Sequence, residues 1–108
     1  MDAKPSIFDF QKFADYLNAY TEHRRSESRA FSLRQLARRM GHSSPSLVTM
    51  IGKGKREPTS DFLHRFAKVA DWNAKELEYA ETLAEYSRHQ TPEQREFYEK
   101  KLERLHPV

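Results

Sequence analysis

The sequence predicts an all-α protein, a compact bundle of about six helices that forms a single domain over residues 1–108. Apolar residues recur at helical spacing along most of the chain, and no segment predicts a strand. Several of these stretches begin with Ser, Thr or Asn and carry Gln or Glu three residues later, which is the capping-box pattern of a helix start. A chain of this length is also the size of one domain with one helical core.

Composition excludes several classes of protein. The chain has no cysteine, so disulfide frameworks and cysteine–zinc sites are excluded. It has no run of about 18 apolar residues, and its N-terminus lacks the apolar segment of a signal peptide. We therefore expect no membrane association and a cytoplasmic location, on the nucleoid when the protein is bound to DNA.

The first helix is expected from about Ile7 to about Ser26. Its apolar residues keep helical spacing and are expected in the core: Phe10, Phe13, Ala14, Leu17 and Tyr20. The basic residues in its last turns complement the partial negative charge at the end of a helix.

The segment that organises the chain follows, from Phe31 to Arg56. Ser32 and Gln35 form a capping box, and Phe31 and Leu36 are placed as a hydrophobic staple around it. Leu33, Leu36, Ala37 and Met40 then fall on one helical face. Gly41 is expected to stop this helix, because a left-handed residue costs little only for glycine.

A second short helix is expected over residues 44–51. Ser43 or Ser44 caps it, and Pro45 suits its first turn, where a missing N–H costs nothing. Its inward residues are expected to be Leu47, Met50 and Ile51. Its outward residues are expected to be Ser44, Ser46, Val48 and Thr49. Two short helices joined at Gly41 form a helix-turn-helix by pattern.

These residues resemble the helix-turn-helix of the Cro/repressor-type (XRE-like) superfamily. The matching features are Ala37, Gly41, Leu47, Met50, the Gly54-Lys55-Arg56 sequence and the Pro58-Thr59 sequence after it. The resemblance covers residues 30–72 well and the whole chain more loosely. The segments on either side are similar to the N-terminal region of a family of bacterial transcriptional regulators. The resemblance implies a lambda-repressor-like fold, no enzymatic activity, and a 44–51 helix that enters the major groove of DNA. By position in the family motif, the expected base-reading residues are Ser43, Ser44, Pro45, Ser46, Val48 and Thr49.

The charge distribution points to the same class of partner. Residues 24–56 hold nine basic residues and one acid, a net charge of +8, while the rest of the chain holds ten basic and 15 acidic residues, a net charge of −5. Basic charge gathered on a helix-turn-helix favours a polyanion over an ordinary solvated surface. The expected DNA phosphate contacts are Arg34, Arg38, Arg39, Lys53, Lys55 and Arg56.

Three further helices complete the expected bundle. One starts after Pro58 with Thr59 as its cap, the next has the pair Asn73 and Glu76, and the last opens with Thr91, Pro92 and Gln94. The C-terminal helical pair, residues 73–106, is expected as a dimerisation element. A homodimer would let two recognition helices read two half-sites about one helical turn apart.

The sequence leaves one alternative open, a helix-turn-helix-derived protein–protein interaction module that does not bind DNA. The five histidines lack metal-ligand spacing, and no nucleophile elbow or phosphate loop occurs, so we expect no catalysis, no metal, no cofactor and no small-molecule substrate. Single-stranded RNA binding is disfavoured, because the basic stretch holds only Phe31 as an aromatic residue. The side chains expected to read DNA bases are short, which predicts modest sequence discrimination.

Overall fold

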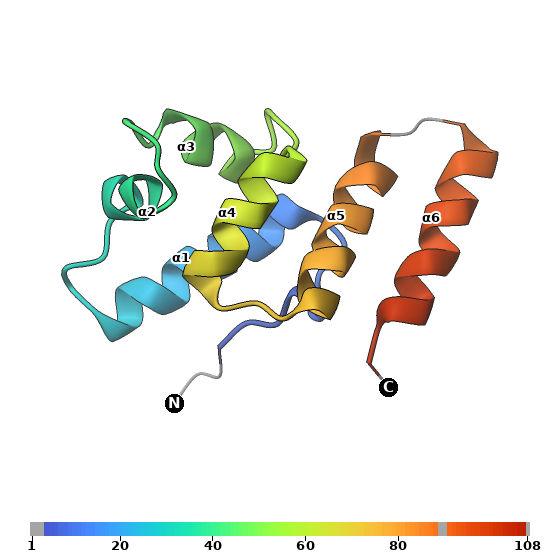
Figure 1. The fold of residues 1–108 in the computed structure, drawn as a ribbon, viewed down its shortest axis with the longest axis horizontal. Helices are drawn as coiled ribbons and strands as arrows, with labels where there is room; N and C mark the ends of the chain where they lie inside the picture. Colours follow the sequence, from blue (N-terminus) through green and yellow to red (C-terminus); the bar gives the residue numbers. More distant parts are fainter. Residues whose placement is uncertain (1–3, 89–90, 108) are drawn as a thin grey trace.

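The computed structural model describes residues 4–88 and 91–107, and all of its regular secondary structure is helical (Figure 1). A 3-10 turn, η1, is followed by six α-helices within these residues. Their bounds are η1 Ile7–Asp9, α1 Phe13–Glu27, α2 Leu33–Arg39, α3 Ser46–Gly52, α4 Ser60–Ala70, α5 Ala74–Arg88 and α6 Pro92–Leu105. This confirms the all-α prediction. None of the described helices combines the length and the apolar character needed to cross a membrane.

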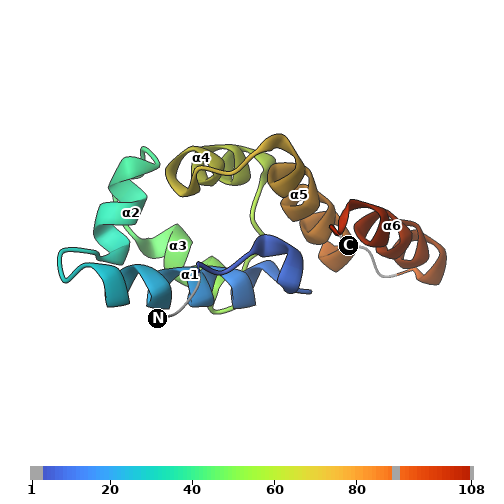
Figure 2. The same cartoon turned by 90° about the horizontal axis from the view of Figure 1, so that it is seen from below.

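The helices enclose an aromatic core. Figure 2 shows α1 and α4 on opposite sides of the body, α2 closing one end, α5 towards the other, and α6 outside α5. Phe66 of α4 lies at the centre, with its ring centroid 5.0 Å from that of Tyr20 and 5.1 Å from that of Trp72. Tyr16 is equally buried and accepts a hydrogen bond from Trp72 Nε1 at 3.2 Å. Burial raises the pKa of Tyr16 well above its usual value.

The expected first helix is wrong at its start. Residues Ile7–Asp9 form a separate 3-10 turn, Phe10 is extended, and α1 begins at Phe13. The physical reason is tertiary, because the Tyr79 hydroxyl donates a hydrogen bond to the Phe10 carbonyl at 3.1 Å. That carbonyl is therefore bound by α5 and not by a helix of its own.

The predicted start signals are confirmed at α2, α4, α5 and α6. Gln35 N–H donates to Ser32 Oγ at 3.1 Å, which caps α2. Asn73 and Glu76 form a reciprocal capping box in which both bonds are 2.9 Å. The remaining caps are Thr59 on Phe62 N–H for α4 and Thr91 on Gln94 N–H for α6. Local sequence thus fixes where these four helices begin.

α6 is the peripheral helix of the fold. It packs along α5 and buries none of its 14 residues, although Leu102 and Leu105 are half-buried against the core. Phe97 is 58% exposed. The body formed by α1–α5 therefore carries the buried core.

Candidate nucleic-acid interface

The turn between α2 and α3 is built around Gly41, as the sequence predicts. Gly41 has φ +87° and its N–H donates to Arg38 O at 3.0 Å. His42 N–H donates to Ala37 O at 2.8 Å. Together these bonds form a Schellman motif, in which a left-handed residue lets the chain close the last turn of the helix.

Arg65 of α4 holds this turn from outside. Its Nη1 donates to Met40 O at 2.9 Å, and its Nε pairs with Asp61 at 3.0 Å. The sequence reveals the Asp61–Arg65 pair through its i,i+4 spacing, but nothing in it shows that Arg65 also reaches α2. Arg65 therefore fixes the end of α2 in a way that sequence reasoning missed.

α3 begins two residues later than expected and ends one residue later. It spans Ser46–Gly52 and not 44–51, and Pro45 occupies the position before it without a side-chain cap. Ser44 Oγ accepts a hydrogen bond from Ser46 N–H at 3.3 Å and donates one to Ser46 Oγ at 3.2 Å. Of the two expected caps, Ser44 is thus the one that binds the start of the helix.

The predicted inner and outer faces of α3 are wrong at two positions. Val48, expected among the base readers, is 1% exposed, whereas Met50, expected in the core, is 38% exposed. The contact with α1 explains this, because Asn18 Nδ2 donates to Gly52 O at 2.9 Å. A Cβ atom at Gly52 would lie 3.2 Å from Asn18 Oδ1, so only glycine allows this close approach without a shift. Val48 lies one turn before Gly52 and faces α1 with it.

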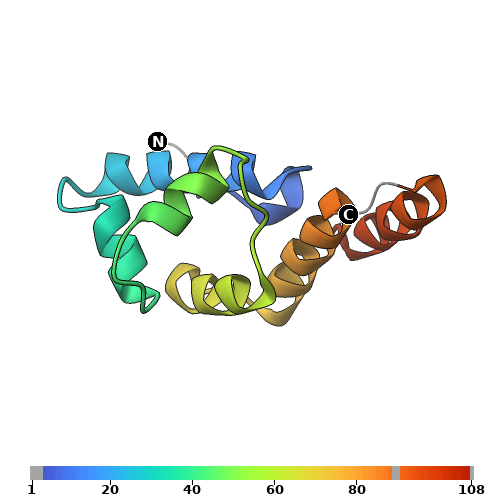
Figure 3. The ribbon, with the colours of Figure 1, turned by 90° about the horizontal axis from the view of Figure 1, so that it is seen from above.

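The exposed face of α3 therefore differs from the predicted one. Ser46, Met50 and Lys53 are exposed and follow one another at intervals of four and three residues, which places them on one face of α3 and its last turn. Ser43 and Ser44 are exposed in the turn before the helix. Thr49 is half-buried and lines a hollow that α3 forms with α1. Pro45 is also half-buried. In the view from above, none of the helices that the structure describes lies over α3 (Figure 3).

All six predicted phosphate contacts are exposed, but they do not form one group. Arg34 and Arg38 share a face of α2 by their i,i+4 spacing. Arg39 lies apart from them, in a hollow with Lys68 and Val69 of α4. The other three predicted contacts, Lys53, Lys55 and Arg56, lie in the loop between α3 and α4. None of the six forms an ion pair with another residue in the described part of the chain.

The α3–α4 loop is held in place at both of its ends. Gly54 has φ +74°, and Lys55 N–H donates to Met50 O at 2.9 Å, a second Schellman motif. At the far end of the loop, Arg88 Nη2 donates to Pro58 O at 2.6 Å. The basic residues of this loop therefore stand on a backbone that hydrogen bonds hold at both ends.

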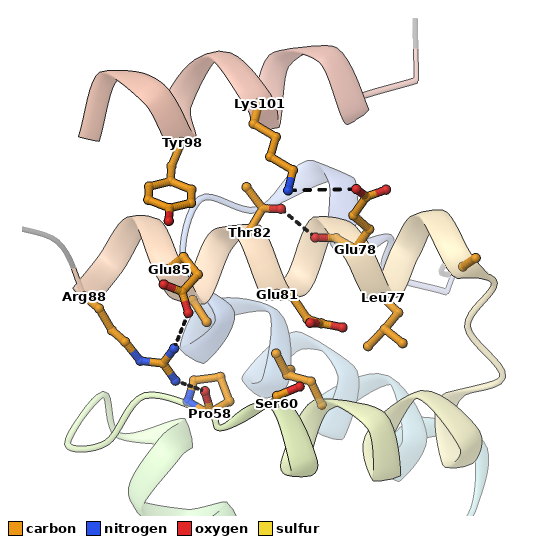
Figure 4. A pocket seen from close by; sticks show the side chains of 13 residues that line it. Pro58, Ser60, Leu77, Glu78, Glu81, Thr82, Glu85, Arg88, Tyr98 and Lys101 are labelled. Atoms are coloured by element: carbon orange, nitrogen blue, oxygen red, sulfur yellow. Dashed lines mark hydrogen bonds and ion pairs between the residues drawn. The ribbon is translucent and has the colours of Figure 1, made fainter. Parts of the chain in front are cut away.

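A groove of about 440 Å³ between α4, α5 and α6 has an acidic wall, in contrast to the basic α3–α4 loop (Figure 4). Its α5 wall carries Glu78, Glu81 and Glu85, two of which pair with bases: Glu78 with Lys101 at 3.9 Å, and Glu85 with Arg88 at 2.7 Å. A polyanion is disfavoured at this groove and favoured at α2, α3 and the loop after them.

Comparison with known proteins finds no match, since no family model, no curated protein and no solved structure resembles this chain significantly. The functional evidence therefore lies in the geometry and charge of the chain itself.

Proposed function

We propose that this chain is a double-stranded DNA-binding protein of the transcription-regulator class. The observation that carries the proposal is the exposed face of α3. It lies between two groups of basic side chains that form no ion pair, one on α2 and one in the α3–α4 loop. The Cro/repressor-like pattern of residues 30–72 supports the same assignment.

The division of roles follows from exposure. The major groove is wide enough for one α-helix, and an uncovered helix can enter it. The proposed groove face is Ser46 and Met50 of α3, with Ser43, Ser44, Pro45 and Thr49 beside it. Val48 supports this face from the core. The proposed phosphate contacts are Arg34, Arg38, Lys53, Lys55 and Arg56, while Arg39 lies next to α4 and is left out.

These readers favour modest sequence discrimination. Serine hydroxyls bond several base edges, and this face has no Arg, Gln or Asn for a bidentate contact to one base. Lys53, at the end of the helix, is proposed as a phosphate contact instead. Met50 adds the one apolar side chain, which suits the methyl group of thymine. Phosphate contacts then supply most of the binding free energy.

A homodimer whose C-terminal helices α5 and α6 form the seam would present two copies of α3 to two half-sites. The protein would act in the cytoplasm, on the nucleoid, without a cofactor and without catalysis.

The alternative is a protein–protein interaction module. The observation that favours it is Met50, since an exposed methionine among serines can also meet an apolar surface of a protein partner. Such a partner would bind without the strong salt dependence of phosphate contacts.

Titration of a 20-base-pair duplex at several salt concentrations tests the proposal. We expect the logarithm of the binding constant to fall linearly with the logarithm of salt, with a slope of about −4 to −5 for about five phosphates. Lys55→Ala with Arg56→Ala should reduce this slope by about 2 and weaken all sequences alike. The matched control, Lys68→Ala with Lys75→Ala, removes the same charge from exposed residues outside the proposed DNA surface and should leave the slope unchanged. The absence of duplex binding at low salt would favour the interaction module.

Met50 can be tested by removing thymine methyl groups. A duplex of alternating A·T pairs and the same duplex with uracil differ only in the methyl groups of the major groove. We expect wild type to prefer the thymine duplex and Met50→Ala to bind both duplexes equally. An unchanged preference in Met50→Ala would remove Met50 from the groove face.

A further inference from the structure

A hollow of about 310 Å³ opens between the first turn of α1, the α3–α4 loop and the adjoining ends of α5 and α6. Three basic residues line it, each from a different part of the chain: Lys12, Arg56 and Arg95. We propose that this basic hollow binds a phosphate group of the DNA strand that passes the α3–α4 loop. The inference rests on the proposed function and adds Lys12 and Arg95 to it.

The charge of the hollow suits an anion. Glu57 is the only acid among its lining residues, so the lining carries three positive charges and one negative. Burial is the main influence on Glu57 and raises its pKa. The first-turn residues Phe13 and Ala14 of α1 also line the hollow. The first N–H groups of a helix have no partner within it and carry partial positive charge, which adds to the effect of the bases.

The basic side chains are available to a ligand. Within residues 4–88 and 91–107, Lys12 and Arg56 form no ion pair, and Lys12 makes no side-chain bond at the start of α1. Arg95 Cζ lies 5.1 Å from the centroid of the Tyr86 ring. This is a cation–π contact and not an ion pair, so the guanidinium keeps its positive charge for a phosphate.

The hollow continues the proposed DNA surface. Arg56 belongs both to the α3–α4 loop and to the hollow. Figure 1 shows α3, this loop, the end of α5 and the start of α6 along the same upper edge of the molecule. A strand contacted by Lys53 and Lys55 can therefore run on towards Arg95. This gives α6, which contributes no buried residue, a role as the carrier of a phosphate contact.

The experiment measures duplex binding against salt for wild type, for Lys12→Gln with Arg95→Gln, and for the control Lys68→Gln with Lys75→Gln. All four residues are exposed, so circular dichroism should show the same helix content in each variant. We expect the Lys12/Arg95 variant to lose about 1 from the magnitude of the slope, since one phosphate contact is lost, and to bind about tenfold more weakly near physiological salt. Ethylation interference should disappear at the outermost phosphates and persist at the central ones. The control should match wild type.

A second measurement separates the hollow from the proposed function. Inorganic phosphate and thymidine monophosphate are titrated against the isotope-labelled full chain while the amide signals of Phe13 and Ala14 are followed. Saturable shifts in wild type that vanish in the Lys12/Arg95 variant support a phosphate site, and a tighter response to the nucleotide would indicate a free nucleotide as its source.

The outcomes are distinct. If wild type binds duplex and the Lys12/Arg95 variant keeps the slope of the control, the hollow does not bind a DNA phosphate, and the proposed function stands. If no duplex binds, the proposed function fails and the phosphate titration alone decides. Absence of amide shifts would then overturn the hollow as well.

Discussion

α4 and α6 are amphipathic helices with similar start signals and opposite roles in the fold. Both begin with a threonine cap, Thr59 and Thr91, whose hydroxyl accepts an N–H three residues later. α4 buries five of its 11 residues, whereas α6 buries none of its 14. A good cap therefore predicts that a helix forms and where it begins, but it does not predict how much of the core that helix carries.

The difference in burial between α4 and α6 also predicts which helix contributes to stability and which to binding. α4 forms one side of the body, and its Phe66 meets aromatic rings from α1 and from the residues after α4. α6 touches the body only at its edge and offers exposed charge. We expect substitutions in α4 to change the free energy of unfolding and substitutions in α6 to change association with partners.

The largest expected effect is that of Phe66→Ala. A phenylalanine truncated to alanine in a packed core typically costs about 3–5 kcal/mol. Leu102→Ala in α6 should cost less than about 2 kcal/mol, because Leu102 is only half-buried. Urea denaturation followed by circular dichroism gives both values. Since Phe66→Ala removes a large part of a typical stability, Phe66→Leu provides a milder variant that should remain folded. Equal losses for Phe66→Ala and Leu102→Ala would show that α6 belongs to the core.

The next effect concerns the turn that α4 stabilises. Gly41→Ala should destabilise the protein by about 1–2 kcal/mol, because φ +87° is strained for alanine. The added Cβ would also lie 2.5 Å from Arg65 Nη1 and would displace it from Met40 O. Gly54→Ala is the matched control, since its φ is +74° and its Cβ would meet no atom within 4 Å. Thermal unfolding should show the greater loss for Gly41→Ala. Equal losses would mean that Arg65 contributes nothing to the turn.

Caps and turns could be predicted from the sequence because they are local. Ser32, Thr59, Asn73 and Thr91 each bond a group within three residues, and Gly41 ends α2 through bonds to the preceding turn. Only residues close in the chain take part, so sequence spacing contains the information.

The faces of α3 could not be predicted because tertiary contacts decide them. A seven-residue helix with Leu47, Val48, Met50 and Ile51 offers more than one apolar stripe. The approach of Asn18 to Gly52 selects the stripe that contains Val48 and exposes Met50. The break at Phe10 has the same origin, since Tyr79 binds its carbonyl from 69 residues away.

The substitution Tyr16→Phe tests the hydrogen bond between Trp72 and Tyr16 inside the core. Tyr16→Phe leaves Trp72 Nε1–H without its acceptor and should cost about 1 kcal/mol at neutral pH. Because burial raises the pKa of Tyr16 in the folded state, the unfolded chain loses the proton first as pH rises above about 10. Wild type should then lose stability relative to Tyr16→Phe by about 1.4 kcal/mol per pH unit. Urea denaturation at pH 8 to 11 measures this difference. A constant difference across that range would show that the Tyr16 hydroxyl is open to solvent.

The smallest expected effect on folding is that of Phe97→Ser in α6. Phe97 is 58% exposed, so its loss should change the free energy of unfolding of a monomer by less than about 0.5 kcal/mol. The same substitution should weaken the proposed homodimer about tenfold or more, because a large aromatic side chain at a seam often contributes 2 kcal/mol or more to association. Sedimentation equilibrium over a range of protein concentrations measures the dissociation constant, and urea denaturation at low concentration measures folding. Phe62→Ser in α4 is the contrasting variant, since it should unfold the chain and not merely separate two copies. An unchanged dissociation constant in Phe97→Ser would place the seam away from this face of α6. The contrast with α4 would then rest on burial alone, and α6 would not be an association helix.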